Sequence, residues 1–305
     1  MVNLKTLYIF FSDRKWDNLF IFKLLFFETI LSLAIIKYVP YTEIDWIAYN
    51  EEVDAWWING ERDYMKIRGG TGPLVYPAGF LYFYRIIQYT VGGDGRDIYT
   101  AQKIFVVLYV LNSWVILILF TKVMRQNAKN IETRSVQRQV KKYDSSINHG
   151  ENMDVPHLVW SWRLAMGLCC LSKRMHSIFM LRLFNDAPAM FLLYISTVLF
   201  TESKWKLGCV FFSLGVSVKM NILLFAPGLL LLLLQTMDDI FQTMECLAIC
   251  AFVQLLLGAP FLLSYPISYL KKAFEFDRVF FYKWTVNWKV KYTSILFSNI
   301  ISHSF

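Results

Sequence analysis

The chain has 305 residues, of which 56% are hydrophobic and only 18% are charged. Soluble globular proteins carry about 25% charged residues, so this composition excludes an ordinary soluble domain and favours a membrane protein with several spans. The net charge of +8 does not indicate nucleic-acid binding, because the basic residues gather in short polar links between apolar runs, as they do in cytoplasmic loops. All five cysteines lie in apolar segments, which is typical of buried small side chains rather than of disulfides or metal ligands.

The first apolar run is Leu19–Val39, and it follows three basic residues near the N-terminus. Its length favours an uncleaved signal anchor whose N-terminus is cytoplasmic. The polar segment 40–72 that comes next holds seven acids and three bases. An acidic loop after the first span agrees with a location on the non-cytoplasmic side.

Residues 73–91 are apolar but are interrupted by Pro77, Gly79 and Arg85. Four tyrosines in this stretch suit the headgroup boundary, so an interfacial helix and a true span are both possible. The next span, Ala101–Thr121, is followed by residues 122–142, with seven basic residues and one acid. We expect 122–156 to be a cytoplasmic loop, which leaves 40–100 wholly on the other side and favours the interfacial helix.

Five further spans are expected at His157–Ser172, Asp186–Thr201, Lys206–Val218, Asn221–Gln235 and Glu245–Ser264. Counting crossings from a cytoplasmic N-terminus places 173–185, 219–221 and 265–290 on the same side as 40–100. The predicted fold class is an all-α, polytopic membrane protein. The whole of 1–305 is expected to form a single membrane-embedded module.

The acidic stretch after the first span is the first candidate for chemistry. Asp45, Tyr49 and Glu52 share one face if the stretch is helical, and Glu43 precedes them. A carboxylate held near an acceptor hydroxyl can act as a general base. The alternative is a solvated acidic loop without a catalytic role.

Cations in three polar links are candidates for binding an anion. His176 and Arg182 flank a short hairpin between spans, where an ion pair of Arg182 with Asp186 is the structural alternative. Lys219 interrupts an apolar stretch, where it binds an anion or simply caps a helix end. Basic and aromatic residues alternate over 271–288, including Arg278 and Trp284, which predicts either interface anchoring or recognition of a lipid phosphate.

Several motifs are absent from the sequence. It holds no Gly-x-x-x-x-Gly-Lys phosphate loop, no zinc-type Cys/His spacing and no Gly-x-Ser-x-Gly elbow. It also lacks Asp-x-Asp, which argues against a metal-dependent transferase that uses a nucleotide sugar.

Seven runs together resemble the dolichyl-phosphate-mannose-dependent α-1,3-mannosyltransferases of the N-glycan precursor pathway. They occur in that family's order and cover about residues 40–290. The runs are Thr-Glu-Ile-Asp-Trp (42–46), Thr-Gly-Pro-Leu-Val-Tyr-Pro-Ala-Gly (71–79), Ala-Gln-Lys-Ile-Phe (101–105), His-Ser-Ile-Phe (176–179), Leu-Arg-Leu-Phe-Asn-Asp (181–186), Ser-Val-Lys-Met-Asn (217–221) and Trp-Thr-Val-Asn-Trp (284–288).

The resemblance implies a GT-C type fold in the endoplasmic reticulum membrane, with its site and interfacial helices on the lumenal face. The implied donor is dolichyl-phosphate-mannose, and the implied acceptor is the dolichyl-diphosphate-linked five-mannose oligosaccharide. Because the donor is β-linked and the product α-linked, a single inverting displacement is implied, without a cofactor or an obligatory metal. After Trp288 the family continues with further spans that this chain lacks, so a shortened and inactive member is one alternative. A lipid transporter or flippase is another.

The resemblance implies that Asp45 is the base, with Glu43 and Glu52 orienting or replacing it. The leaving group is already a stable anion, so cations that neutralise its growing charge are expected rather than a general acid. The residues expected to bind the substrates or the lipid phosphate are Arg68, Tyr76, His176, Arg182, Lys219, Arg278 and Trp284.

Overall fold

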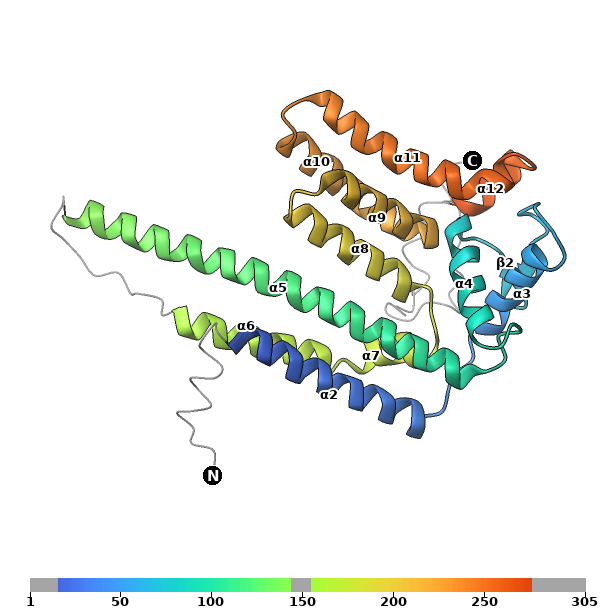
Figure 1. The fold of residues 1–305 in the computed structure, drawn as a ribbon, viewed down its shortest axis with the longest axis horizontal. Coiled ribbons are helices and arrows are strands. Elements are labelled where there is room, and N and C mark those ends of the chain that lie inside the picture. Colours follow the sequence, from blue (N-terminus) through green and yellow to red (C-terminus); the bar gives the residue numbers. More distant parts are fainter. Residues whose placement is uncertain (1–15, 144–154, 276–305) are drawn as a thin grey trace, which may run out of the picture. The chain divides into compact units, whose positions relative to one another are not determined.

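The computed structural model describes residues 16–143 and 155–275 of the chain. The described part is almost entirely helical, and α2 to α12 belong to one compact unit (Figure 1). Its long and medium helices are α2 (Asp17–Tyr38), α3 (Trp46–Trp57), α4 (Ala78–Thr90), α5 (Ile98–Tyr143), α6 (Val155–Cys170), α8 (Asp186–Thr201), α9 (Trp205–Val218), α10 (Ala226–Thr236) and α11 (Ile240–Leu262). Short elements are α7 (Lys173–His176), the π-helix η2 (Ser177–Leu181), the 3-10 helix η3 (Met220–Phe225) and α12 (Pro266–Ala273). Strands β1 (Arg68–Gly69) and β2 (Gly72–Pro73) form a small antiparallel hairpin.

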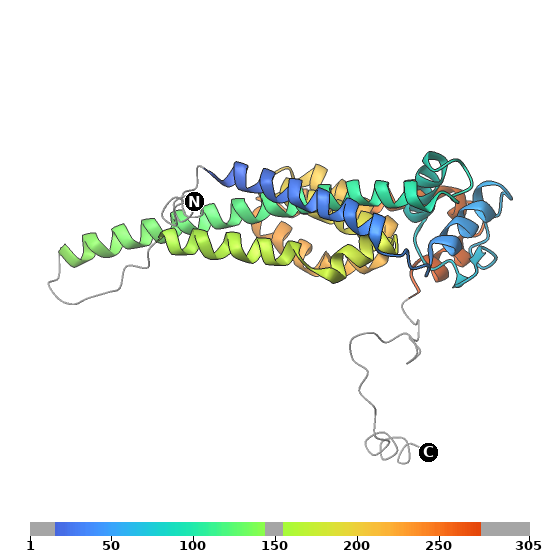
Figure 2. The same ribbon diagram turned by 90° about the horizontal axis from the view of Figure 1, so that it is seen from below.

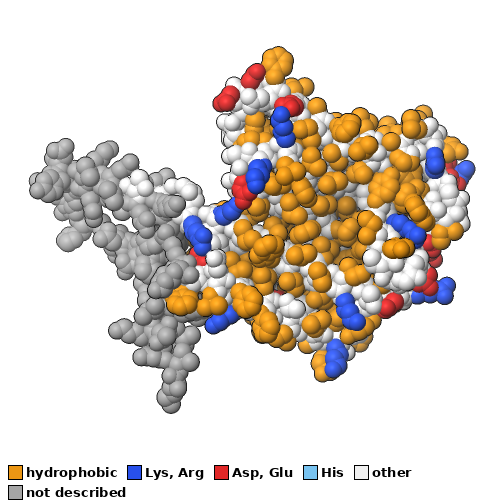
Figure 3. All heavy atoms as spheres, in the orientation of Figure 1, with side chains coloured by type: hydrophobic (Ala, Val, Ile, Leu, Met, Phe, Trp, Pro, Cys, Tyr) orange, Lys and Arg blue, Asp and Glu red, His pale blue; other side chains and the backbone are white. Residues whose placement is uncertain are grey.

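Three described helices are long and apolar enough to cross a membrane: Asp17–Tyr38, Ile98–Asn127 and Ile240–Leu262. A fourth candidate is a bent pair, Lys173–Leu181 with Asp186–Thr201, whose halves meet at 112°. Large apolar side chains such as Phe22 and Phe26 on α2 and Phe252 on α11 are exposed. Figure 3 shows one broad hydrophobic face with charged side chains mainly toward its edges. The predicted class, an all-α polytopic membrane protein, is confirmed.

Within the compact unit, α2, α5 and α6 lie side by side, and α8 and α9 pack beside them (Figures 1 and 2). A buried ion cluster fixes one end of the first group, where Asp17 on α2 bonds Arg163 on α6 and Arg125 on α5. At the other end, both views place α3, α4 and α12 together. Asp63, between α3 and β1, accepts a hydrogen bond from Ser268 on α12. This bond ties α12 to the acid-rich segment 40–72, here called the acidic segment.

The predicted loop 122–156 is helical in its first part, because α5 continues unbroken to Tyr143, while residues 144–154 lie outside the described residues. Neither glycine nor proline occurs between Ile98 and Tyr143, and the basic stretch is rich in residues that form helices well. Positive charge indicates the side of the membrane, not where a helix ends. The helix therefore extends well beyond the apolar part of its sequence.

The segment 73–91 also differs from its prediction at one end. The helix α4 begins only at Ala78, after Pro77, since residues 72–73 form β2. With 13 residues, α4 is about 20 Å long, which is shorter than the hydrocarbon core of about 30 Å. Its length suits an interfacial position better than a crossing.

The helices α4 and α9 approach most closely at Gly79. A Cβ atom built on Gly79 would lie 2.1 Å from Ser217 Oγ and 2.9 Å from the Ser217 carbonyl carbon. Such distances leave no room for a side chain, because the Ser217 backbone cannot rotate away. Glycine at this position brings the start of α4 against the end of α9.

We predict that Gly79→Ala destabilises the chain by about 1–3 kcal/mol through overpacking. The thermal unfolding midpoint of the purified chain in detergent measures this effect. Gly228→Ala on α10 is the matched control, since a Cβ there meets nothing within 4 Å. Equal midpoints for the two variants would contradict the close approach of α4 and α9.

Candidate functional site

The bent pair of helices contains a break at residues 182–185, between the end of η2 and the start of α8. Leu183 adopts a φ of +51°, a left-handed conformation that is strained for a side chain of this kind. Helix ends leave carbonyl groups without partners inside the helix. Backbone of this kind is tolerated at membrane depth only where protein or a water-filled cavity surrounds it.

Three separate elements bind the carbonyls around the break. Gln102 on α5 donates its Nε2 to the Met180 carbonyl at 2.8 Å. The backbone N–H of Thr42 donates to the Leu181 carbonyl at 3.0 Å. Tyr84 on α4 donates its hydroxyl to the Leu183 carbonyl at 2.9 Å. The acidic segment, α4 and α5 therefore converge on the break.

Asp45 is half-buried at the N-cap of α3, close to this point. Glu43 lies beside it, but its two oxygens bond Tyr41 Oη at 2.7 Å and the backbone N–H of Ile47 at 3.2 Å. Glu43 therefore stabilises the start of α3. Burial and the charges of Glu43 and Asp45 raise the pKa of Tyr41 well above its ordinary value.

Glu52 lies two turns further along α3, about 10 Å from Asp45 along the helix axis. It is only 4% exposed and lies near the buried ring of Tyr64, whose raised pKa is due mainly to burial and partly to the charge of Glu52. The three candidate acids do not form one cluster. Among them, Asp45 alone is half-buried near the break.

An aromatic cluster contacts both Asp45, whose carbonyl accepts from the Tyr49 backbone N–H, and the break, where Tyr84 binds Leu183. It consists of Tyr49, Tyr76, Phe80 and Tyr84, and neighbouring ring centroids are 4.6–5.9 Å apart. Burial is the main cause of the raised pKa of Tyr84, and the nearby charges of Asp186 and Asp45 raise it further. Both carboxylates therefore lie near the same phenol.

Lys219 is fixed by the residues that follow the break. Its Nζ lies 2.7 Å from Asp186 Oδ2 and 2.9 Å from Asn185 Oδ1. The ion pair considered for Arg182 with Asp186 is wrong, because Asp186 pairs with Lys219. The left-handed turn at Leu183 separates Arg182 from the start of α8, whereas the contact of Gly79 with Ser217 places the end of α9 near the break.

Two other predicted cations lie in different surroundings. The side chain of Arg182 is half-buried at the break and makes no hydrogen bond or ion pair within residues 16–143 and 155–275. Arg68 is exposed in the β1–β2 hairpin. Arg278 and Trp284 lie outside the described residues, so their predicted roles stay predictions.

The side chain of His176 does not contact Asp45, Lys219 or Arg182. It is buried at the end of α7, where its Nε2 lies 2.9 Å from Glu28 Oε2 and its Nδ1 lies 3.0 Å from the Ser172 carbonyl. Both ring nitrogens thus have protein partners, which does not favour binding of a phosphate. The sequence interpretation missed Asn185, Asp186 and Tyr84 as site residues. The signal available for the first two was a polar Asn-Asp pair at the very start of a span.

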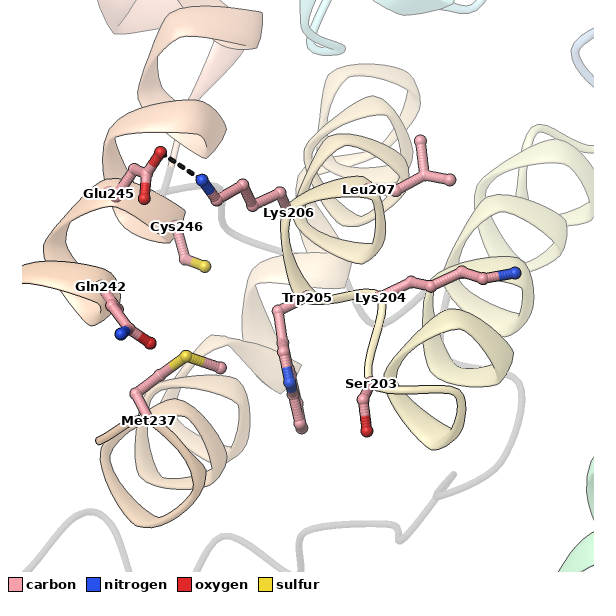
Figure 4. Close-up of a pocket in the computed structure, with 9 residues that line it drawn as sticks. All are labelled: Ser203, Lys204, Trp205, Lys206, Leu207, Met237, Gln242, Glu245 and Cys246. Carbon is pink, nitrogen blue, oxygen red and sulfur yellow. Dashed lines mark hydrogen bonds and ion pairs between the residues drawn. The ribbon is translucent and has the colours of Figure 1, made fainter. Parts of the chain in front are cut away.

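A cavity of about 570 Å³ lies away from these residues (Figure 4). It is lined by Ser203, Lys204, Trp205, Lys206, Leu207, Met237, Gln242, Glu245 and Cys246. Asp186 begins α8 and Ser203 follows its end, so the cavity lies about 22 Å along that helix from the break. Its two lysines pair with Glu202 and Glu245. It is therefore separate from the site at Asp45.

The model of a family described as "ALG3 protein" matches residues 22–138 and 154–304. The chain belongs to the ALG3 protein family.

Curated relatives agree with this family. The chain is 47% identical over 270 residues to the Arabidopsis thaliana protein named Dol-P-Man:Man(5)GlcNAc(2)-PP-Dol alpha-1,3-mannosyltransferase, covering 88% of this chain and 52% of the relative. Proteins of the same name from Mus musculus and Homo sapiens are 45% and 43% identical over 262 residues, covering 86% of this chain and 51% of each relative. The chain thus spans about half the length of the ALG3 relatives it matches. None of the solved structures matches it significantly.

We predict that Tyr84→Phe destabilises the chain by about 1–3 kcal/mol, because it leaves the Leu183 carbonyl buried without its donor. Thermal unfolding in detergent measures the change. Tyr89→Phe, an exposed tyrosine at the end of the same helix, serves as the control and is expected to have no effect. An unchanged midpoint in Tyr84→Phe would show that this hydrogen bond does not hold the break.

Proposed function

We propose that the chain transfers mannose from dolichyl-phosphate-mannose, in α-1,3 linkage, to the dolichyl-diphosphate-linked five-mannose oligosaccharide. We propose that it acts on the lumenal side of the endoplasmic reticulum membrane. The names of its relatives support this donor and this acceptor. One observation carries the proposal. The half-buried carboxylate of Asp45 lies near a broken helix, whose break contains Arg182 and whose Asp186 binds Lys219.

In the proposed reaction, an acceptor hydroxyl oxygen attacks the anomeric carbon of mannose. As the new C–O bond forms, the bond from this carbon to the phosphate oxygen breaks, and its electrons leave with dolichyl phosphate. The hydroxyl proton passes to Asp45. Attack from the face opposite the β-linked phosphate gives the α-linked product, and the leaving anion needs no proton from a general acid.

Arg182 and Lys219 are the proposed ligands of the leaving phosphate. Arg182 makes no ion pair within the described part of the chain, so its guanidinium has donors for a phosphate. Lys219 is held by Asn185 and Asp186, which fixes its ammonium before the donor binds. Preorganised cations stabilise charge that grows in the transition state. Tyr76, in the aromatic cluster, is a proposed wall for the sugar.

Asp45→Asn tests the base. We expect mannose transfer to fall about 10²–10⁴-fold, because the amide cannot accept the proton. Microsomes that express the chain, supplied with labelled dolichyl-phosphate-mannose and the five-mannose acceptor, measure the product. The control Asp94→Asn removes an exposed acid of the same polar region and is expected to leave the rate unchanged. Full activity of Asp45→Asn would exclude Asp45 as the base.

Lys219→Met tests the phosphate ligand, and its expected effect is a loss of about 10²-fold in kcat/KM for the donor. Lys204→Met, at the distant cavity, is the matched control. The double variant Lys219→Met with Asp186→Asn removes both charges of the ion pair. If the double variant regained full activity, Lys219 would serve only to neutralise Asp186, and the proposed role would be wrong.

A further inference from the structure

Glu28, Tyr109 and His176, here called the Glu28 unit, form a buried polar cluster outside the proposed site. Glu28 lies in the middle of the first span and is 0% exposed. Its Oε2 lies 2.9 Å from His176 Nε2 and accepts a hydrogen bond from Tyr109 Oη at 2.8 Å. Polar groups at such a depth are costly unless they are paired, so this pairing calls for a physical explanation.

The contacts of His176 fix the position of its protons. The Ser172 carbonyl, 3.0 Å from Nδ1, only accepts hydrogen bonds, so Nδ1 carries a proton. The 2.9 Å contact of Nε2 with Glu28 Oε2 requires a second proton between these two atoms. Whether this proton lies on the ring or on the carboxyl, the pair has no net charge. A neutral pair is the form that an apolar span tolerates.

The other oxygen of Glu28 strengthens this conclusion. Oε1 is buried and has no hydrogen-bond partner in the part of the chain that the structure describes. A bare carboxylate with one oxygen unpaired would be strongly destabilised at this depth. The Cys170 thiol on α6 is a further titratable group nearby, and Lys173 and Arg174 on α7 are exposed.

We propose that the Glu28 unit holds one shared proton and thereby positions the break at residues 182–185 for the donor. His176 directly precedes η2, which runs into the break. The first span is thereby tied through one hydrogen bond to the backbone that carries Arg182 and Asn185. His176 is then a positioning residue rather than a phosphate ligand. This inference rests on the proposed function for its effect on the donor, but not for the shared proton.

Glu28→Gln is the decisive variant. Its side-chain amide can donate one hydrogen to His176 Nε2 and the other to Tyr109 Oη, whose own hydrogen then points to the Cys170 carbonyl at 3.3 Å. This keeps the hydrogen bonds and removes the shared proton. Tyr109→Phe is the matched control, since it loses one hydrogen bond but keeps the proton. Glu28→Ala removes the tie altogether.

Thermal unfolding of the full chain in detergent at pH 7 tests the neutral unit without any activity. We expect the midpoint of Glu28→Gln to stay near the wild-type value, because the amide keeps the hydrogen bonds and carries no charge. We expect the midpoint of Tyr109→Phe to fall slightly and that of Glu28→Ala to fall further. Mannose transfer at pH 7 then tests the positioning. Glu28→Ala is expected to raise the donor KM about tenfold, and Glu28→Gln to leave it near the wild-type value.

A Glu28→Gln variant that unfolds at as low a temperature as Glu28→Ala would overturn the shared proton, because a neutral amide would then fail to replace the side chain. An unchanged donor KM in Glu28→Ala would overturn the positioning role. If the wild-type chain transferred no mannose at all, the proposed function would fail, but the unfolding experiment would still decide whether the unit holds its proton.

Discussion

The hydrogen bond from Tyr84 to the Leu183 carbonyl is the interaction on which the rest of the site depends. A helix that breaks and turns by 112° leaves carbonyl groups without partners, and a membrane-embedded protein must supply them internally. Tyr84, Gln102 and the backbone of Thr42 do this from three elements. Because each donor is fixed by the carbonyl it binds, these three hydrogen bonds hold the acidic segment 40–72, α4 and α5 against the broken helix.

The same constraint explains the arrangement of charge. Asp45 and Asp186 both lie near Tyr84, and Lys219 neutralises Asp186 through a 2.7 Å ion pair. Asp186 is thereby paired with a cation, whereas Asp45 lies at the start of the short helix α3. Environments that treat two carboxylates differently are a common way to assign them different roles. We propose the proton transfer for Asp45 and the fixing of Lys219 for Asp186.

Much of the helical framework could be predicted from the sequence, because span length and hydropathy are local properties. The prediction for Asp186–Thr201 agrees with α8 in both bounds, and the prediction for Lys206–Val218 is one residue short of α9. The end of α5 could not be predicted in this way, since its charged continuation is a good helix former with no breaking residue. The family resemblance agrees with the family model that matches the chain.

The pairing of side chains was much less predictable. The partner of Asp186 depends on the left-handed turn at Leu183 and on the lack of a side chain at Gly79, which bring Lys219 rather than Arg182 into reach. Similarly, His176 pairs with Glu28, which lies 148 residues away. Spacing along the chain carries no information about such contacts. Asp45 could be chosen as a candidate base, but its surroundings required the structure.

A cysteine cross-link tests whether the acidic segment 40–72 and the broken helix form one site. Cysteines would replace Thr42 and Leu181, whose backbones are joined by a 3.0 Å hydrogen bond, in a chain whose five native cysteines are changed to alanine. We expect rapid disulfide formation between positions 42 and 181 on mild oxidation, and none between positions 42 and 203. Failure of the first pair to cross-link, or equal cross-linking of both pairs, would show that the two segments do not form one site.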